Sequence, residues 1–387
     1  MTPITTTAEL SRFCSHLAGA PFVAVDTEFM RETTYWPKLC LIQAAAPEGE
    51  AVIDPLAAEI DLAPFLTVLR DERTLKVFHA ARQDVEIFNN LGALPNPLFD
   101  TQIAAMAAGF GEQVAYESLV RQMLKAQVDK SSRFTDWARR PLSESQLAYA
   151  LADVTHLARL YPMLRQQLES AGRLAWVTEE IAAIADPALY DVDPENAWRR
   201  LKPRRHSARY LAVFRAVAAW RERTAQNRDQ PRGRILRDEA IDELAAQAPT
   251  TTEALMRLRA VPRGFAGSRF GDELLTAIRY GLKNAEDYAP ALPRPVHPAT
   301  PPAAAVVELL KVLLKARAEE AGVAPRLIAA VSDLDKIAAA DDADVPALCG
   351  WRREVFGEDA LRLKRGELAL MVDGDQVRLA PVRRKGE

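Results

Sequence analysis

The stretch FVAVDTEFMRE, residues Phe22 to Glu32, decides the fold prediction, because an apolar run leads directly into two acids. Such a run is typical of a buried strand, and side chains two positions apart on a strand project from the same face. Asp26 and Glu28 are therefore expected to project together from a strand end. Adjacent carboxylates repel unless a cation lies between them, and Mg²⁺ or Mn²⁺ would be suitable because hard divalent ions prefer oxygen ligands. Taken alone, the pair is explained more simply as two solvated acids.

The sequence around this strand predicts an α/β fold. Further apolar runs indicate strands at residues 39–46, 51–55, 75–80 and 97–101. A helix is expected from about residue 82 to 91, and Ser143 and Gln146 form a capping box at the start of a long helix. Pro162 is expected to kink that helix or to end its first part. Three close strands, followed by strands that alternate with helices, predict a mixed sheet that begins as an antiparallel meander and carries helices on both faces.

Composition divides the 387 residues into several domains. The α/β pattern covers residues 1–187. Residues 198–287 have a helical pattern and contain 19 Lys or Arg and 11 Asp or Glu, a net charge of +8 in a chain whose net charge is −3. Residues 288–302 are rich in proline, which predicts a semi-rigid linker that holds the last segment, 303–387, at a distance. This last segment is mostly helical in pattern.

Cysteine usage and the amino terminus favour a cytoplasmic protein without a membrane partner. Cys14, Cys40 and Cys349 are far apart in the sequence. An odd number of cysteines argues against a disulfide framework. The first ten residues, MTPITTTAEL, lack the basic and apolar regions of a signal peptide. No apolar run is long enough to span a bilayer.

Two further pairs of residues complete a pattern with Asp26 and Glu28. His79 lies at a strand end in HAARQDVEIF, and Asp84 follows in the first turn of the next helix, where it could merely complement the helix dipole. Tyr149 and Asp153, in YALAD, are four residues apart and therefore share one face of the capped helix. Each pair is ordinary alone, but in this order their side chains could converge.

At this point the chain resembles the ribonuclease D family, which belongs to the tyrosine subtype of the DEDD superfamily of 3′→5′ exonucleases. The resemblance depends on the stretches VDTEF, FHAARQD, FDTQIAA and YALADV, in that order. It implies a ribonuclease H-like exonuclease domain in residues 1–187. The basic segment, 198–287, resembles the helicase-and-RNase-D C-terminal (HRDC) domain, and residues 303–387 resemble a diverged second copy.

The resemblance also implies an active site and a reaction. By it, Asp26, Glu28, Asp84 and Asp153 bind two divalent metal ions, Mg²⁺ or Mn²⁺, and Tyr149 orients the attacking water. Tyr149 is also the residue that indicates the subtype. The implied reaction is hydrolysis from the 3′ end of RNA, chiefly of tRNA precursors, with release of 5′-mononucleotides. The residues agree with this, because paired divalent ions can clamp an in-line phosphoryl displacement. No obligate protein partner is evident.

Other candidate residues have two explanations each. Phe29 and Met30 could wedge against the terminal base or simply pack, and His79 is better explained as a hydrogen-bonded core residue than as a ligand. Lys130 and Arg133 are candidates for contacts with backbone phosphates, or for a solvated loop.

Three more residues are expected to be structural. Asp100 is expected to be the N-cap of the helix that starts at Gln102. Tyr210 and Phe265 could stack on bases, although packing is favoured.

The reaction class leaves two alternatives. A DNA exonuclease would use the same chemistry, because two metal ions bound at the scissile phosphate do not by themselves distinguish ribose from deoxyribose. An RNA-binding module with a decayed active site would lack one of the four acids, and all four are present. The surplus positive charge of residues 198–287 is expected to hold RNA electrostatically.

Overall fold

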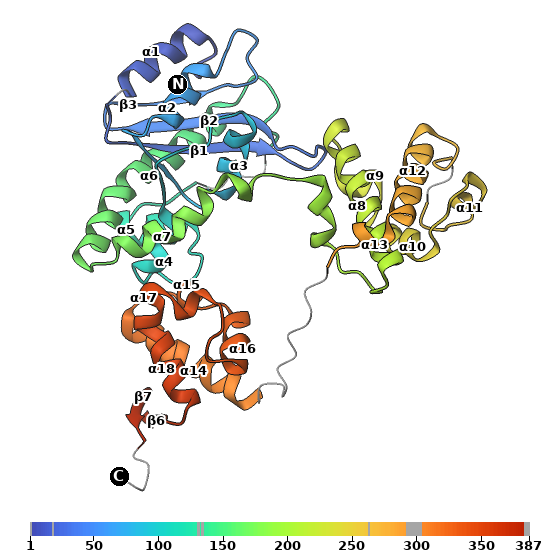
Figure 1. Ribbon diagram of the computed structural model, residues 1–387. Coiled ribbons are helices and arrows are strands. Elements are labelled where there is room, and N and C mark those ends of the chain that lie inside the picture. Colours follow the sequence, from blue (N-terminus) through green and yellow to red (C-terminus); the bar gives the residue numbers. More distant parts are fainter. Residues whose placement is uncertain are drawn as a thin grey trace. The chain divides into compact units, whose positions relative to one another are not determined.

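The computed structural model describes residues 2–17, 19–129, 132, 135–261, 264–291 and 304–382 (Figure 1). The candidate residues Lys130 and Arg133, and most of the predicted linker, lie outside these residues. The chain forms two compact units, and each is described by itself. The first comprises Met1–Thr27, Leu41–Asp186 and Pro295–Glu387, and the second comprises Glu28–Cys40 and Pro187–Arg294.

A five-stranded mixed sheet forms the centre of the α/β region, as the sequence predicts. Its strands are β1 (Phe22–Met30), β2 (Lys38–Ala46), β3 (Gly49–Ile53), β4 (Leu75–Phe78) and β5 (Leu98–Asp100). Their order is β3-β2-β1-β4-β5, so the first three strands are neighbours as in the expected meander. Strand β2 is antiparallel to β3, whereas β1 and β5 both run parallel to β4. Val23 to Val25 are fully buried, which explains why this apolar run forms a strand at the centre of the sheet.

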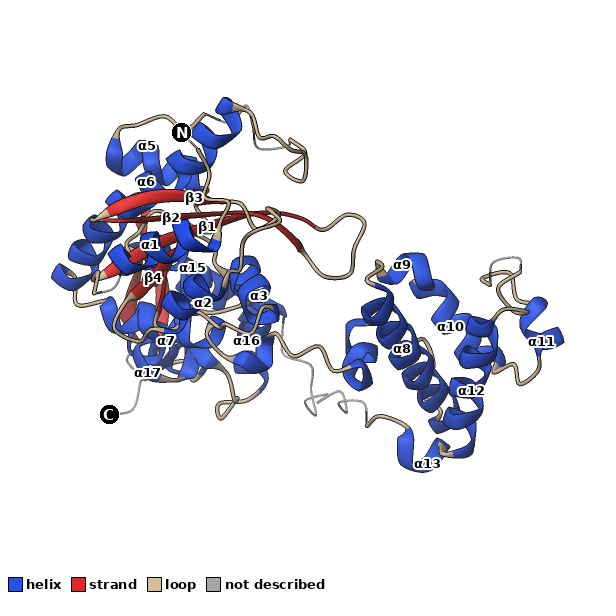
Figure 2. Ribbon diagram, turned by 90° about the horizontal axis from the view of Figure 1, so that it is seen from above, coloured by secondary structure: helices blue, strands red, loops and turns tan. Residues whose placement is uncertain are grey.

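Helices cover both faces of the sheet. They are α1 (Thr7–Leu17), α2 (Ala63–Arg70), α3 (Arg82–Asn90), α4 (Thr101–Ala107), α5 (Tyr116–Leu124), α6 (Glu144–Ser170) and α7 (Leu174–Ile184). In Figure 1, α1 and α2 lie above strands β1 and β2, while α4 to α7 lie below them, and Figure 2 shows the same strands from above. No helix within the described ranges is both long and apolar enough to cross a membrane.

Helix α6 begins with the predicted capping box. The Ser143 hydroxyl accepts from the Gln146 backbone N–H, and the Gln146 side chain accepts from the Ser143 N–H. The helix does not end at Pro162 but continues to Ser170. Proline removes one helical hydrogen bond, yet buried Leu160, Tyr161, Leu164 and Leu168 hold the helix against the protein on both sides of that position.

The second unit contains a helical region that buries its own core. Its elements are η1 (Pro187–Leu189), η2 (Pro194–Arg200), α8 (Ala208–Arg228), α9 (Arg232–Ile235), α10 (Asp238–Gln247), α11 (Thr252–Met256), α12 (Arg269–Lys283) and α13 (Ala285–Tyr288). Helix α8 is the central helix, with both apolar and polar residues buried along its length. Tyr210 is buried and donates to Asp242 at 2.5 Å, and Phe265 packs edge-on against Trp220. Both aromatic residues therefore pack, as favoured above.

The last segment contains helices and one strand pair that was not predicted. Its elements are α14 (Ala304–Ala321), α15 (Pro325–Ile328), α16 (Val331–Ala339), η3 (Pro346–Leu348), α17 (Gly350–Arg352), the π-helical η4 (Arg353–Gly357), α18 (Glu358–Lys364), β6 (Leu368–Asp373) and β7 (Gln376–Pro381). Strands β6 and β7 pair antiparallel across a tight turn at Gly374.

The last segment packs directly on the α/β region, so the expectation that the linker holds it at a distance is wrong. The rings of Trp176 and Trp351 stack with centroids 4.2 Å apart. Arg352 donates to Glu179 at 2.6 Å, and Arg173 donates to the Gly322 carbonyl at 3.1 Å. A proline-rich connection limits local backbone freedom, but it does not prevent a downstream apolar surface from packing on the α/β region.

Candidate active site

Three predicted acids converge where β1 passes α6. Asp26 and Glu28 project from β1, and Asp153 comes from the buried part of α6. One carboxylate oxygen from each lies within 4.8 Å of the other two. The expected alternation on β1 thus delivers both of its acids to one place, and α6 adds a third.

Asp84, the fourth predicted acid, lies in the first turn of α3 and is buried. It accepts a 2.5 Å hydrogen bond from the hydroxyl of Thr27, the residue between Asp26 and Glu28. This bond ties the first turn of α3 to β1. Asp84 is not part of the group of three oxygens within 4.8 Å, but it is close enough to Asp26 for their charges to interact.

Burial and mutual repulsion make two of these acids hard to ionise. Burial raises the pKa of Asp26 to about 6, although the Thr27 backbone N–H partly opposes this shift. Burial, followed by repulsion from Asp26, raises the pKa of Asp84 well above its usual value. Burial and close spacing both disfavour the ionised form of these carboxylates. A bound cation would remove much of this cost.

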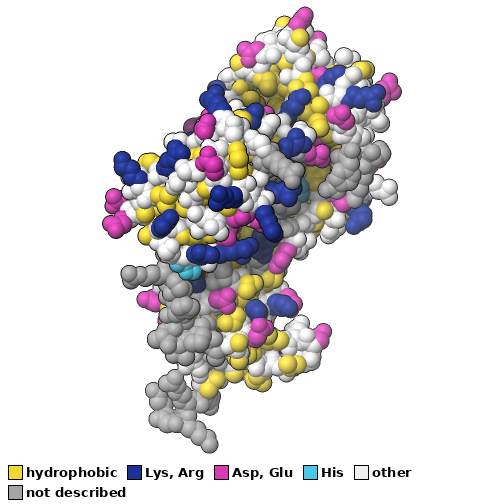
Figure 3. All heavy atoms as spheres, turned by 90° about the vertical axis from the view of Figure 1, so that its right-hand side faces the viewer, with side chains coloured by type: hydrophobic (Ala, Val, Ile, Leu, Met, Phe, Trp, Pro, Cys, Tyr) yellow, Lys and Arg dark blue, Asp and Glu magenta, His cyan; other side chains and the backbone are white. Residues whose placement is uncertain are grey.

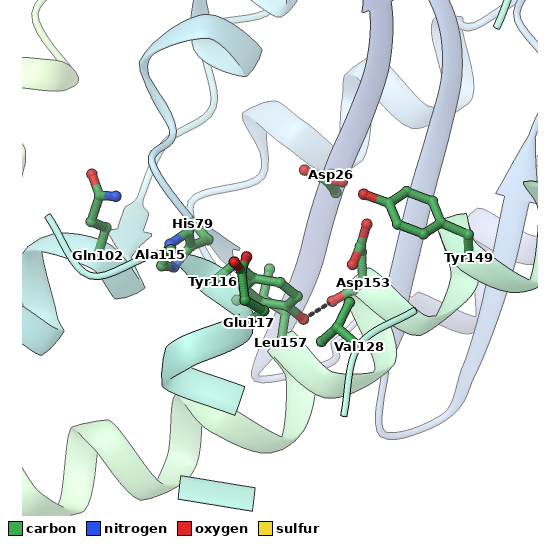
Figure 4. Close-up of a pocket in the computed structure, with 10 residues that line it drawn as sticks. All are labelled: Asp26, His79, Gln102, Ala115, Tyr116, Glu117, Val128, Tyr149, Asp153 and Leu157. Atoms are coloured by element: carbon green, nitrogen blue, oxygen red, sulfur yellow. Dashed lines mark hydrogen bonds between the residues drawn. The ribbon is translucent and has the colours of Figure 1, made fainter. Parts of the chain in front are cut away.

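Tyr149 reaches the same site from one turn earlier on α6. Its hydroxyl points toward Asp26 and lies beside the Asp153 carboxyl in Figure 4. The Trp137 ring supports the Tyr149 ring, with centroids 6.0 Å apart. Tyr149, Asp26 and Asp153 line a cavity of about 310 Å³, together with His79, Gln102, Ala115, Tyr116, Glu117, Val128 and Leu157.

Tyr116 is a site residue that sequence reasoning missed. It opens α5, and its hydroxyl donates to the main-chain carbonyl of Asp153 (Figure 4). Burial, and then repulsion by the nearby acids, raises the pKa of Tyr116, so the phenol stays protonated and remains a donor. Tyr116 thus fixes the turn of α6 that carries Asp153. No local pattern could reveal this, because the two residues are 37 positions apart.

His79 lines the cavity from the side opposite Tyr149 in Figure 4. Its Nδ1 lies 3.0 Å from the Thr101 hydroxyl, which itself donates to the Phe78 carbonyl. Nδ1 is therefore the donor in this pair. Burial lowers the pKa of His79 and keeps the ring neutral. This supports the interpretation of a hydrogen-bonded core residue, and a contact with substrate stays a prediction.

Asp100 is the N-cap of α4, as predicted, and it has a second role. One carboxylate oxygen accepts from the Gln102 N–H at 2.7 Å. The same carboxylate accepts from the Ala80 and Ala81 N–H groups at 3.0 and 2.8 Å. Ala80 has a positive φ of 59°, which is unfavourable for alanine. Asp100 therefore holds the turn that starts α3 and so places Asp84.

Phe29 and Met30, at the end of β1, are partly buried. Neither belongs to the residues that line the cavity. Their predicted contact with the terminal base stays a prediction.

The fold and the carboxylate cluster define a 3′→5′ exonuclease followed by helical domains. Residues 1–169 match the family model for the 3′-5′ exonuclease, and residues 210–278 match the HRDC domain. The chain is 51% identical to ribonuclease D of Granulibacter bethesdensis over 98% of this chain and 96% of that protein, and 50% identical to ribonuclease D of Nitrobacter hamburgensis over 97% and 98%.

A solved structure agrees. The crystal structure of Escherichia coli RNase D, an exoribonuclease involved in structured RNA processing, superimposes with a TM-score of 0.79 at 31% identity and covers 95% of this chain and 99% of that one. The chain belongs to the ribonuclease D family of 3′→5′ exoribonucleases. Its family resemblance, fold class and enzyme class are thereby confirmed, and a DNA exonuclease or an inactive module is no longer needed to explain it.

Proposed function

We propose that this exoribonuclease trims the 3′ ends of precursor tRNA and releases 5′-mononucleotides, with two divalent cations, Mg²⁺ or Mn²⁺, at the carboxylate cluster. The observation that carries the proposal is the convergence of Asp26, Glu28 and Asp153, with oxygens within 4.8 Å of one another. The exoribonuclease of Escherichia coli that resembles this chain is involved in structured RNA processing, which supports a structured substrate here.

The residues of the site fit hard divalent cations. All four acids offer oxygen ligands, which Mg²⁺ and Mn²⁺ prefer. Burial, and for Asp84 also repulsion from Asp26, raises the pKa values of Asp26 and Asp84, and bound cations would favour their ionised forms. Asp26, Glu28, Asp84 and Asp153 would hold the ions. When bound, such ions would stabilise charge on the attacking and leaving oxygens of an in-line displacement at phosphorus.

Tyr149 is proposed to position the water. A phenol is a poor general base near neutral pH, but it is a good hydrogen-bond donor and acceptor. The Tyr149 hydroxyl points into the cavity beside Asp153, and the Trp137 ring limits its movement. A water held there would face the scissile phosphate in a fixed orientation, which lowers the entropic cost of attack.

Long RNA is proposed to bind first to the helical region. A cleft of about 550 Å³ there is lined by exposed Arg234, Arg237 and Arg259, together with Glu239. None of these three arginines forms an ion pair within the described part of the chain, unlike Arg221 in the same region. Guanidinium groups bind phosphate in a bidentate manner. Figure 3 shows basic side chains (dark blue) gathered in several places on the face that it draws.

A cytoplasmic location is part of the proposal. Cys14, Cys40 and Cys349 are all free thiols. Free thiols, one of them exposed, fit a reducing compartment.

The test is a comparison of matched oligonucleotides. A tRNA with a 3′ trailer, labelled at its 5′ end, is expected to shorten one nucleotide at a time in Mg²⁺ or Mn²⁺. The same RNA with a blocked 3′ end should persist, the matched DNA should be cut more slowly, and exhaustive chelation should stop the reaction. Asp153→Asn is the control for contaminating nucleases. Internal cleavage, or full activity after chelation, would refute the proposal.

A further inference from the structure

The loop between β1 and β2 ends in the core of the helical region. Tyr35, at the tip of this loop, is only 6% exposed and belongs to the apolar cluster formed by α8, α10 and α12. Trp36 packs against the same cluster and meets the Tyr35 ring edge-on, with centroids 4.7 Å apart. A hairpin of the nuclease sheet thus supplies part of the core of the second unit.

A buried polar network fixes the Tyr35 side chain. Its hydroxyl donates to Glu222 of α8 at 2.5 Å, and Glu222 is only 1% exposed. Arg232 forms a bidentate pair with Glu222, at 2.6 and 2.5 Å, and also donates to the Tyr35 hydroxyl at 2.9 Å. Its guanidinium lies over the Tyr35 ring, 4.6 Å from the centroid. A buried carboxylate is tolerated only when it is fully paired, so this network favours one geometry of the loop.

The loop backbone is held as well. The N–H groups of Tyr35 and Trp36 both donate to one carboxylate oxygen of Asp229, at 3.0 and 2.9 Å. Asp229 is the C-cap of α8 and has a positive φ of 48°. Two successive amides are therefore satisfied by a single side chain at a helix end, and the loop is anchored through both main chain and side chain.

This anchor lies on the strand that carries two of the site's acids. The described pairing of β1 with β4 covers only Phe22 to Ala24. Beyond it, β1 continues through Asp26 and Glu28 to Met30 before the anchored loop begins. The Thr27–Asp84 bond ties β1 to α3 just before Glu28, and the anchor holds the strand from its other side, beyond Met30.

We propose that Tyr35 is a positioning residue for hydrolysis: by anchoring the loop on α8 it fixes the end of β1 that bears Glu28. The helical region then contributes to the cleavage step itself, in addition to binding RNA. This inference rests on the proposed function, and it differs from the simplest expectation, in which the α/β region cleaves on its own and a very short RNA is insensitive to loss of the helical region.

The test uses the full chain and a triribonucleotide, which carries too few phosphates for the electrostatic capture proposed for long RNA. The variants are Tyr35→Ala, Tyr35→Phe and Asp229→Gly. Glycine adopts a positive φ without strain, and Asp229 is exposed, so the third variant removes the amide acceptor without disturbing the core. Tyr280→Ala is the matched control, because Tyr280 is 53% exposed and contributes nothing to the anchor.

Two measurements are made besides folding. The first is steady-state kinetics with the triribonucleotide, which gives kcat and KM, and the second is Mn²⁺ affinity without RNA, determined by electron paramagnetic resonance of the free ion. A displaced ligand should lower kcat by about 10- to 100-fold in Tyr35→Ala and Asp229→Gly and should weaken Mn²⁺ binding. Tyr35→Phe keeps the packed ring, so its kcat and its Mn²⁺ affinity should fall less than those of Tyr35→Ala. Tyr280→Ala should match the parent in both measurements.

The outcomes distinguish a failure of the proposed role of Tyr35 from a failure of the proposed function. If folded Tyr35→Ala and Asp229→Gly keep the parent's kcat for the triribonucleotide and its Mn²⁺ affinity, the anchor does not position Glu28 and the inference is overturned. If Tyr35→Ala fails to fold, Asp229→Gly decides alone. If the parent itself does not shorten the triribonucleotide from its 3′ end, the proposed function fails instead.

Discussion

Replacing Asp26 by asparagine should stabilise the protein when no metal is bound. Burial raises the pKa of the Asp26 carboxyl from 3.8 to about 6. A shift of about two pKa units corresponds to ~3 kcal/mol of free energy of unfolding. This is an upper value, because Asp26 and Asp84 repel each other and share the effect. Asparagine has nearly the same shape and keeps an oxygen for the Thr27 N–H, but it carries no charge.

The stabilisation should depend on pH in a defined direction. Because the folded protein binds the Asp26 proton more tightly than the unfolded chain does, protonation of Asp26 favours folding. This contribution is complete below pH 3.8 and is lost as the pH rises through about 6. The parent therefore lacks it at pH 7.5, whereas the asparagine variant is neutral at every pH. The difference in Tm between variant and parent should be largest at pH 7.5 and should vanish near pH 4.

The assay is thermal unfolding of both proteins after chelation, at pH 4.0 to 7.5, and then with Mg²⁺ or Mn²⁺. For a domain of this size, ~3 kcal/mol corresponds to a rise in Tm of roughly 6–12 °C. Added metal should stabilise the parent, by about 2.7 kcal/mol at a hundredfold excess over Kd, and should stabilise the variant much less. A variant that melts below the parent at pH 7.5 without metal, or that gains as much from metal, would refute this account of Asp26.

Three further results are expected. Tyr149→Phe should slow single-turnover cleavage by about 10- to 100-fold while Mn²⁺ affinity stays unchanged, and an unchanged rate would make Tyr149 structural. Replacing both Arg234 and Arg237 by glutamine should weaken tRNA binding and reduce the salt slope of log K by about 2, with no change in kcat for a triribonucleotide; an equal slope would mean that the cleft does not contact phosphate. Trp351→Ala should lower the free energy of unfolding by about 3–5 kcal/mol in urea denaturation, because it removes a buried ring stacked on Trp176, and an unchanged midpoint would show that the last segment unfolds independently.

Local chemistry made much of the fold predictable from the sequence. The apolar run at Phe22 to Val25, the capping box at Ser143 and the N-cap at Asp100 each depend on residues close together in the chain, and each is present in the structure. The β6–β7 hairpin was missed although its sequence contains a signal. Gly374 and Asp375 form a two-residue turn between two short strands, which is a common hairpin pattern.

The parts that could not be predicted depend on distant partners. The Thr27–Asp84 bond and the Tyr116–Asp153 bond join residues 57 and 37 positions apart. Nothing in the neighbourhood of Thr27 or Tyr116 indicates these bonds. The family resemblance supplied the expected metal-binding roles of the four acids, whereas spacing alone supplied the shared face of Asp26 and Glu28 and the shared face of Tyr149 and Asp153.

The anchor at Tyr35 affects the stage of synthesis at which the nascent chain can become active. Glu222 follows Tyr35 by 187 residues, and ribosomes add ~5–20 residues per second, so roughly 10–40 s separate the synthesis of the two residues. During that interval the acidic strand is already present on the nascent chain while its anchor on α8 does not yet exist. If the anchor positions Glu28 as proposed, a chain that stops early would be a weak nuclease, and RNA cleavage would become efficient only once the segment that captures long RNA has also been made.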